Sequence, residues 1–332
     1  MNQRSAFTVS LIVLVAFGVA APWLGFYESF LMKFWCFALF ACAFNLLAGF
    51  GGLISFGHAA FFGGAAYIAG FAIKSLGFPP LLGIVAGGFF GAIVGVFAGY
   101  LSVQRKGIYF SMVTLGTAQL IYFLFLQAPF SGGEDGLQNI PRGQLLPGAT
   151  LNNNLTMYYL VFAIFLSGFL AIARIVDSPF GQAIKAIRQN EPRAISLGYN
   201  VSAYKLAAFV LSATLAGVAG ATKSVVFQLA SLSDVHWAMS GEVILITLVG
   251  GLGTLYGPVI GAFLIIALEN QLATTAGSWS QVILGIVFIV CVSGFRQGIV
   301  GTWKEFAAKR FRFTPKVVAL ATSNQQTEPG SQ

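Results

Sequence analysis

The polar side chains best suited to chemistry in this sequence occur in two glycine-rich apolar stretches, residues 46–70 and 241–268. These side chains belong to Ser55, His58, Glu242 and Thr254. An interrupted helix exposes backbone groups at membrane depth, and a polar neighbour there can contact a solute that lipid cannot solvate. In the alternative interpretation, the glycines only allow close helix packing, while serine and threonine bond to their own backbone. Both interpretations are open for each residue.

The candidates for a solute pathway lie where each stretch is interrupted. They are Ser55, Gly57, His58, Gly250, Gly253, Thr254 and Gly257. The two stretches also resemble each other, because four positions of the first match four of the second when one residue is skipped: Leu47, Gly49, Gly52 and Gly57 against Leu248, Gly250, Gly253 and Gly257. Internal repeats with interruptions at corresponding places are typical of transporters.

Glycine and proline divide the second stretch into two short helices. Residues 241–250 and 258–268 would each rise about 15 Å, half of a bilayer core, with Gly257 and Pro258 as N-cap and first helical residue. The pattern predicts a hairpin or a re-entrant pair. The helix N-terminus near Gly257 would offer N–H groups and a positive dipole end to a substrate carboxylate. Glu242 and Glu269 fall near the outer ends of their segments, where we expect a solvated role.

The composition is that of an integral membrane protein. Of the 332 residues, 57% are hydrophobic and only 8% are charged, and the mean hydropathy is +0.82. These values lie far from those of soluble domains. The net charge of +8 does not indicate nucleic acid, because the cations stand at the ends of apolar runs rather than in a cluster.

Motifs for catalysis and cofactor binding are missing from the sequence. The nearest approach to a phosphate-binding loop, residues 217–224, has Thr222 where the motif requires glycine and lies inside an apolar run. The sequence has no HExxH or GxSxG motif, and its three cysteines are scattered through apolar runs. We therefore expect a chain that is not an enzyme and that binds no cofactor or metal.

Apolar runs of about 20 residues predict membrane spans. The runs lie at roughly 6–26, 30–49, 55–75, 80–102, 107–127, 155–175, 203–228 and 280–295. With the broken stretch counted as two segments, we expect an all-α polytopic membrane protein with about ten membrane segments. Residues 1–312 would form this transmembrane domain, and residues 313–332, rich in Thr, Ser and Gln, a disordered cytoplasmic tail.

The distribution of lysine and arginine predicts the orientation. Of the 18 cations, all but Lys33, Lys74, Arg142 and Lys223 can be placed on one side of the membrane. The side that carries the excess is the cytoplasm. Both termini and residues 178–200 would then be cytoplasmic, with the loop at 129–154 outside.

Residues 178–200 form the one long polar, basic segment between apolar runs. Ser178 can cap a helix that begins at Pro179, and Asn190 can cap a second, short helix that Gly198 ends. Phe180, Ala183, Ile184 and Ile187 share one face, with Lys185 and Arg188 on the other side. Such a segment either lies on the lipid surface or docks a partner.

Three stretches carry a resemblance to a known family. They are SFGHAAFFGGAAY, MSGEVILITLVGGLGTLYGPVIGAFL and the segment from Arg174 to Ala221, and the stretches at 104–116 and 131–137 are similar too. Together they resemble the permease subunits of bacterial branched-chain amino-acid ABC importers, and in detail the longer of the two permeases. The resemblance covers most of the chain.

The resemblance implies an ABC importer permease fold in the bacterial inner membrane. A binding protein would deliver substrate outside, a second homologous permease would complete the pathway, and two ATPase subunits would hold ATP and Mg²⁺ inside. Residues 178–200 would couple to the ATPase through Gly181, Arg188, Glu191, Ala194, Leu197 and Gly198. The coupling pattern that importers share, EAA-xxx-G, is kept only in part, because Pro192 and Arg193 stand at its first two positions and Glu191 is one position early.

The substrate and the energy source have alternatives. Similar permeases serve urea and short amides, so the resemblance does not choose between these and branched-chain or related hydrophobic amino acids. A secondary transporter without an ATPase is the alternative of a different class. It would need ion or proton relay residues within its spans, and only His58 and Glu242 could supply them.

Overall fold

The computed structural model describes residues 3–146, 149–151, 153–275 and 277–279, together with isolated positions at 282, 283, 285, 286, 289 and 298. The predicted span at 280–295 lies largely outside the described residues. The predicted tail at 313–332 lies wholly outside them.

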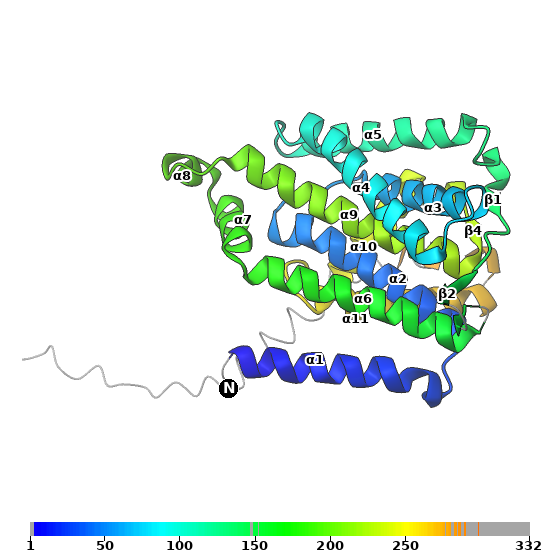
Figure 1. Ribbon diagram of the computed structural model, residues 1–332. Helices are drawn as coiled ribbons and strands as arrows, with labels where there is room; N and C mark the ends of the chain where they lie inside the picture. The colour runs from blue at the N-terminus through cyan, green and yellow to red at the C-terminus, as the bar shows by residue number, and fades with distance from the viewer. Residues whose placement is uncertain are drawn as a thin grey trace, which may run out of the picture.

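Helices that run side by side make up most of the described chain (Figure 1). The long ones are α1 (Gln3–Ala20), α2 (Glu28–Asn45), α3 (His58–Lys74), α4 (Pro80–Ser102), α5 (Ile108–Gln127), α6 (Asn154–Asp177), α9 (Val201–Phe227), α10 (Trp237–Gly250) and α11 (Gly257–Thr275). Two short helices, α7 (Pro179–Gln189) and α8 (Glu191–Ser196), stand between α6 and α9.

Single turns and two-stranded sheets complete the fold. The turns are η1 (Ala21–Leu24), η2 (Leu46–Phe50), η3 (Gly133–Asp135), η4 (Leu232–Asp234) and η5 (Gly277–Trp279). Strand β1 (Leu137–Gln138) pairs antiparallel with β4 (Leu229–Ala230), and β2 (Gln144–Leu146) with β3 (Ala149–Thr150). The β1–β4 pair ties the loop after α5 to the end of α9.

Six of the described helices are long and apolar enough to cross a membrane: α2 continued by η2, α4, α5, α6, α9 and α11. Two further apolar stretches, Thr8–Leu24 and Trp237–Gly250, are shorter. The predicted class of a helical, multi-pass membrane protein is therefore confirmed. The count of about ten segments and the re-entrant pair stay predictions.

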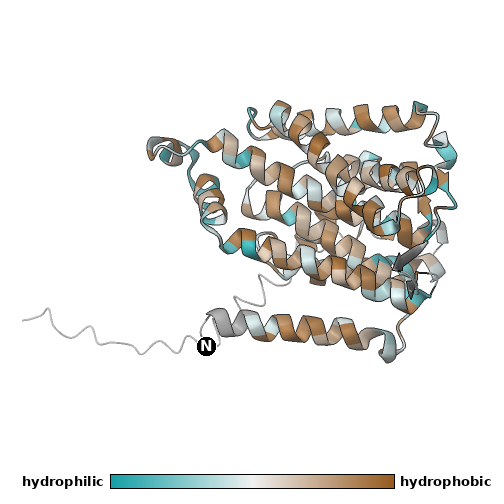
Figure 2. Cartoon of the chain, viewed as in Figure 1, coloured by the Kyte–Doolittle hydropathy of each residue, from teal (hydrophilic) through white to brown (hydrophobic). Residues whose placement is uncertain are grey.

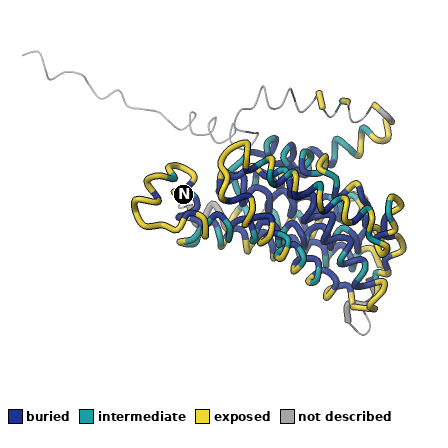
Figure 3. The backbone as a smooth tube through the Cα atoms, turned by 90° about the horizontal axis from the view of Figure 1, so that it is seen from above, coloured by how far each residue is buried: buried dark blue, intermediate teal, exposed yellow. Residues whose placement is uncertain are grey.

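Helix α2 forms the centre of the bundle. In its most apolar window 89% of the residues are buried, against 33–44% for the other five candidate spans, and buried residues fill the middle of the molecule (Figure 3). Trp35 packs against Phe34 and Phe165 with ring centroids 4.4 and 4.6 Å away, and its Nε1 donates to the Tyr158 hydroxyl. A helix that is apolar on all sides can be covered on all sides, and α2 meets α6, α9, α10 and α11.

Glycines bring the outer helices into backbone contact. A Cβ on Gly91 of α4 would lie 2.6 Å from the carbonyl oxygen of Ala213 in α9. A Cβ on Gly220 of α9 would overlap the carbonyl oxygen of Phe62 in α3. Small residues at such contacts allow helices to approach closely in a membrane protein. Close helix packing is therefore enough to explain why Gly91 and Gly220 are glycines.

The two ends of the bundle differ. Helices α7 and α8 and the start of α1 lie at one end, and the β-strands lie at the other (Figure 1). Hydrophilic residues gather toward these ends, with apolar helices between them (Figure 2). Residues 178–200 and the start of the N-terminal helix thus share an end, opposite the described part of the loop at 129–154, as the cation pattern predicts. Which side of the membrane each end faces stays a prediction.

The predicted sequence of helix, break and short helix in residues 178–200 is confirmed. The Ser178 side chain accepts a hydrogen bond from the Gly181 N–H at 3.3 Å, and the Asn190 Oδ1 accepts one from the Arg193 N–H at 3.1 Å. Gly198 ends α8 with φ of +84°. These determinants are local, which is why the sequence pattern located them.

The second half of the broken stretch is longer than the sequence pattern indicated. Instead of residues 258–268, α11 spans Gly257–Thr275, and its 19 residues rise about 28 Å. The apolar pattern stops at Glu269, where polar residues begin, but the helix continues through them to Thr275. Glu269 forms an ion pair with Lys33 of α2, with 3.0 Å between Nζ and Oε2.

We expect Gly220→Ala to destabilise the bundle, because its Cβ would overlap the Phe62 backbone. Overpacking of this kind typically costs about 1–3 kcal/mol. Thermal unfolding of the purified protein in detergent should show a lower midpoint. The matched control is Gly116→Ala in α5, where nothing lies within 4 Å of the added carbon, and where the midpoint should stay or rise. Equal midpoints for the two variants would contradict the packing account.

Candidate functional site

The two glycine-rich stretches meet inside the bundle. In the first, helix α2 passes into the π-turn η2; in the second, residues 251–256 separate α10 from α11. Asn45, at the end of α2, bridges the two breaks. Its Oδ1 accepts from the Gly253 N–H at 2.9 Å, and its Nδ2 donates to the Thr254 carbonyl at 2.8 Å. We call this contact between η2 and residues 251–256 the junction.

Glycine is required on both sides of the junction. A Cβ on Gly49 would lie 2.6 Å from the Gly253 nitrogen. Gly253 has φ of +76°, a conformation that strains any residue with a Cβ. Gly253 was predicted from the sequence as a residue of the break, but Asn45 was not. The available signal was a lone amide in an otherwise apolar run, directly before the break.

Helix α7 reaches the junction through Arg188. The guanidinium Nη1 donates to the Gly49 carbonyl oxygen of η2. Gly52 makes room for this side chain, since a Cβ there would lie 2.8 Å from the Arg188 Cγ. The nearby Lys185 also turns inward, because its Nζ donates to the Val176 carbonyl at 3.0 Å. Both cations were expected on the side away from the apolar face, but the structure directs them toward the membrane helices.

The loop before α3 is held by its own chain. The Ser55 Oγ accepts from the Gly57 N–H at 3.2 Å. The Phe56 N–H donates to the Thr114 Oγ1 at 3.2 Å, and the Ala59 N–H donates to the Ser240 Oγ at 2.9 Å. Ser55 therefore bonds its local backbone, as the packing interpretation holds for that residue.

His58 is fully buried at the start of α3. Its Nε2 lies 2.8 Å from the Ser212 Oγ, and that hydroxyl donates to the Ala43 carbonyl at 2.5 Å. Because the hydroxyl proton is already used, His58 must donate from Nε2, which leaves Nδ1 as an acceptor. Within the described chain Nδ1 has no partner, and Phe44 and Phe61 pack against the ring. A proton relay would need a second partner at Nδ1, and no described residue supplies one.

Thr254 caps α11. Its Oγ1 accepts from the Gly257 N–H at 3.1 Å and donates to the Gly251 carbonyl at 2.8 Å. Gly257 is therefore the first helical residue rather than the N-cap, and its N–H is already bonded. Gly250 and Gly257 also allow α10 and α11 to touch, since a Cβ on Gly250 would overlap the Gly257 carbonyl. A pathway role for these residues stays a prediction.

Several of the coupling candidates face this chain rather than the outside. Gly181 is buried, and a Cβ there would lie 2.5 Å from the Val176 carbonyl of α6. Ala194 is only 3% exposed and packs with Ile187 and Val201. Glu191 forms ion pairs with two lysines, Lys205 at 3.0 Å and Lys106 at 3.3 Å.

The charge of Glu191 is stabilised by these lysines. Partial burial alone would raise the pKa of its carboxyl, but the hydrogen bonds and charges of Lys205 and Lys106 outweigh burial and lower the pKa below its ordinary value of 4.5. The ion pairs are therefore present at neutral pH. Because the folded-state pKa is depressed, their contribution to stability is lost as the pH falls through that pKa.

Apolar side chains are exposed at the end of α8 and just after it. Leu197 is 69% exposed and Ile195 56%. Gly198, which follows them, has open space around it. We call Ile195, Leu197 and Tyr199 the α8 surface. It is the large apolar part of residues 178–200 that is exposed and can contact a partner or lipid.

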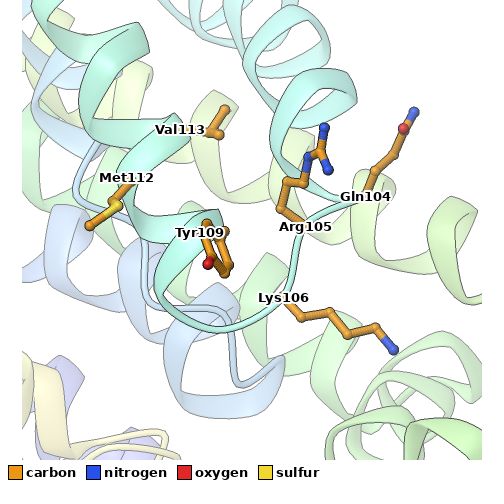
Figure 4. Close-up of a pocket in the computed structure, with 6 residues that line it drawn as sticks. All are labelled: Gln104, Arg105, Lys106, Tyr109, Met112 and Val113. Atoms are coloured by element: carbon orange, nitrogen blue, oxygen red, sulfur yellow. The ribbon is translucent and has the colours of Figure 1, made fainter.

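A pocket lies at the turn between α4 and α5. It has a volume of about 400 Å³ and is lined by Gln104, Arg105, Lys106, Tyr109, Met112 and Val113 (Figure 4). The Lys106–Glu191 ion pair connects the pocket to α8. The lining combines two cations with apolar side chains, so it suits an acidic, partly apolar partner segment.

A second polar region lies at the end of the bundle opposite α7 and α8. The sequence did not predict that its residues would meet. Lys223 forms an ion pair with Asp234, whose side chain is 4% exposed. Lys33 and Glu269 form the other pair. No three His, Cys, Asp or Glu side chains of the described residues are grouped to hold a metal ion.

Comparisons with known proteins identify relatives. The high-affinity branched-chain amino acid transport system permease protein LivM of Salmonella typhimurium is 25% identical over 244 residues, and that of Escherichia coli 24% over 243. Each match covers 66% of this chain and 56% of the relative. The fructose import permease protein FrcC of Rhizobium meliloti is 24% identical over 65% of this chain and 63% of its own length. The chain thus spans little more than half the length of the LivM proteins.

No solved structure matches the chain. The family described as the branched-chain amino acid transport system permease component matches residues 26–292. This range includes both breaks, the junction and helices α7 and α8. Because the match extends over most of the sequence, the chain belongs to the family of permease components of branched-chain amino acid transport systems.

Proposed function

We propose that this chain is the membrane-spanning permease subunit of an ATP-driven, binding-protein-dependent importer of branched-chain or related hydrophobic amino acids. It works with a second homologous permease and two ATPase subunits, which hold ATP and Mg²⁺. An extracytoplasmic binding protein delivers the substrate. The membrane is the bacterial inner membrane, with both termini cytoplasmic. The family and the LivM relatives support the transport class and the substrate.

The observation that carries the proposal is the bond from Arg188 to Gly49. An importer must transmit movement of its ATPase to the solute pathway. Here one side chain of the coupling segment bonds the backbone of a broken membrane helix, and Asn45 ties that break to the second one. Movement of α7 therefore acts directly on the junction.

The α8 surface is the docking surface for the ATPase in this proposal. Apolar side chains that are exposed at a bundle end, beside a basic pocket, fit a protein partner better than water. Ala194, which the sequence analysis expected at this contact, is buried against Ile187 and Val201. An Ala194→Leu variant would therefore disturb α7 and α9 and would not separate docking from folding.

Two alternatives are weaker. A sugar permease is supported by relatives such as FrcC, but the family that matches most of the chain is described by branched-chain amino acid transport. A secondary transporter needs ion or proton relay residues within its spans. Of the two candidates, His58 has no second partner among the described residues, so Glu242 would have to act alone. A urea or short-amide permease of the same family differs only in substrate, and uptake assays distinguish it.

We expect Leu197→Asp to abolish ATPase binding. Burying a leucine contributes about 1.5–3 kcal/mol, or roughly ten- to a hundredfold in an association constant. Copurification of the ATPase subunits with the tagged permease pair measures the loss. The control is Leu76→Asp, a leucine 57% exposed in the loop after α3, which should copurify normally. Full ATPase binding and uptake by Leu197→Asp would show that the α8 surface lies on lipid.

We expect Arg188→Gln to uncouple the transporter. The variant should assemble and hydrolyse ATP at its basal rate, but substrate-loaded binding protein should no longer stimulate hydrolysis, because a charged hydrogen bond of about 1.5–3 kcal/mol is lost. Arg188→Lys should restore part of the stimulation. Arg193→Gln, an exposed cation on α8, serves as control. Normal stimulation in Arg188→Gln would refute transmission through this bond.

A further inference from the structure

Five charged side chains gather at the end of the bundle opposite α7 and α8. They are Lys33 of α2, Lys223 of α9, Asp234 of η4, Glu242 of α10 and Glu269 of α11. We call them the charge cluster. Lys223 and Asp234 flank β4, which Figure 1 places at that end. Ionisable groups within membrane helices are costly and usually functional.

One aromatic ring joins the two ion pairs of the cluster. The Lys33 Nζ lies 5.7 Å from the centroid of the Phe37 ring, and the Lys223 Nζ lies 5.8 Å from the same centroid. Lys223 is bonded to Asp234, and Lys33 is bonded to Glu269. The pairs are therefore neighbours.

The two ion pairs differ in accessibility. The side chains of Lys223 and Asp234 are 17% and 4% exposed, so removing either partner would leave a buried charge. Those of Lys33 and Glu269 are 32% and 39% exposed. An ion pair this open contributes little to stability. A ligand carboxylate can therefore replace Glu269 on Lys33 at little cost.

Glu242 is the member of the charge cluster that has no ion-pair partner in it. Two lysines stand against three carboxylates, and the Glu242 carboxylate has no hydrogen-bond or ion-pair partner within the described part of the chain. Helix α10, which carries Glu242, packs against α2, α11 and η4, which carry Lys33, Glu269 and Asp234. A carboxyl group that has no cation of its own, beside two satisfied pairs, can form an ion pair with the cationic group of a ligand.

We propose that Glu242 and Lys33 recognise the two charged ends of a zwitterionic amino acid. Glu242 binds the ammonium group, and Lys33 exchanges Glu269 for the carboxylate. This inference rests on the proposed function and adds the place and chemistry of recognition. A sugar or urea can donate hydrogen bonds to Glu242 but has neither an ammonium group nor a carboxylate, so we expect the charge cluster to bind the amino acid more tightly than either.

Equilibrium binding to the complete complex, assembled in nanodiscs without the binding protein, tests the proposal. The probes are leucine, 3-methylbutylamine, which lacks the carboxylate, and 4-methylvalerate, which lacks the ammonium group. Glu242→Gln should weaken leucine and the amine by about tenfold or more and leave 4-methylvalerate unchanged. Lys33→Met should weaken leucine and 4-methylvalerate and leave the amine unchanged. A purely structural role would not produce this crossed pattern.

The matched controls are Glu134→Gln and Lys74→Met, which remove exposed charges at the same end and should bind all probes normally. Wild-type protein gives a measurement that needs no variant. The amine should compete with leucine, and the neutral 3-methylbutanol should not. If the alcohol competes as well as the amine, recognition is apolar and the proposal is wrong.

The remaining outcomes separate this inference from the proposed function. Unchanged binding by both variants, with ATP-dependent leucine uptake intact, would overturn the charge cluster as a recognition site and leave the importer standing. A second result would also overturn the charge cluster as a recognition site. In it, proton uptake accompanies leucine uptake and is lost in Glu242→Gln, while leucine binding is unaffected. Glu242 would then be a proton carrier. Uptake of fructose with no leucine binding would overturn both.

Discussion

The interior of this protein depends on one amide side chain. Asn45 uses its donor and its acceptor to join residues 253 and 254 to the end of α2. Backbone groups freed by a helix break cannot bond to lipid, and leaving one unpaired in a dry interior costs several kcal/mol. The two breaks must therefore stay in contact. This constraint fixes the positions of α2, α10 and α11 relative to one another.

The coupling segment is built into the same framework. Gly181 lets α7 touch the end of α6, and Ala194 fastens α8 to the start of α9. Glu191 adds ion pairs to α9 and to the turn after α4. Because so many of its residues are used internally, α7 and α8 follow the membrane helices closely. The large apolar side chains that stay exposed are those of the α8 surface.

Sequence reasoning succeeded where the determinants are local. Ser178, Asn190 and Gly198 act on backbone within three residues, so their caps and the helix end could be predicted. The directions of Ala194 and Arg188 could not, since they depend on α9 and η2. The Lys33–Glu269 pair joins residues 236 positions apart. A hydrophobic pattern cannot show a contact between residues so far apart in the chain. The distribution of cations predicted only that Lys33 lies outside the membrane.

Helix α2 connects the two ends of the molecule. It carries Lys33 near its start and Asn45 at its end, about 18 Å apart along one continuous helix. A helix buried on all sides has little freedom to bend, because close-packed interiors transmit displacement rather than absorb it. The junction that Arg188 contacts and the lysine of the charge cluster therefore belong to one rigid element. A shift of α2 along its axis changes both at once, and in the proposed importer this helix would link the end that meets the ATPase to the end that meets the substrate.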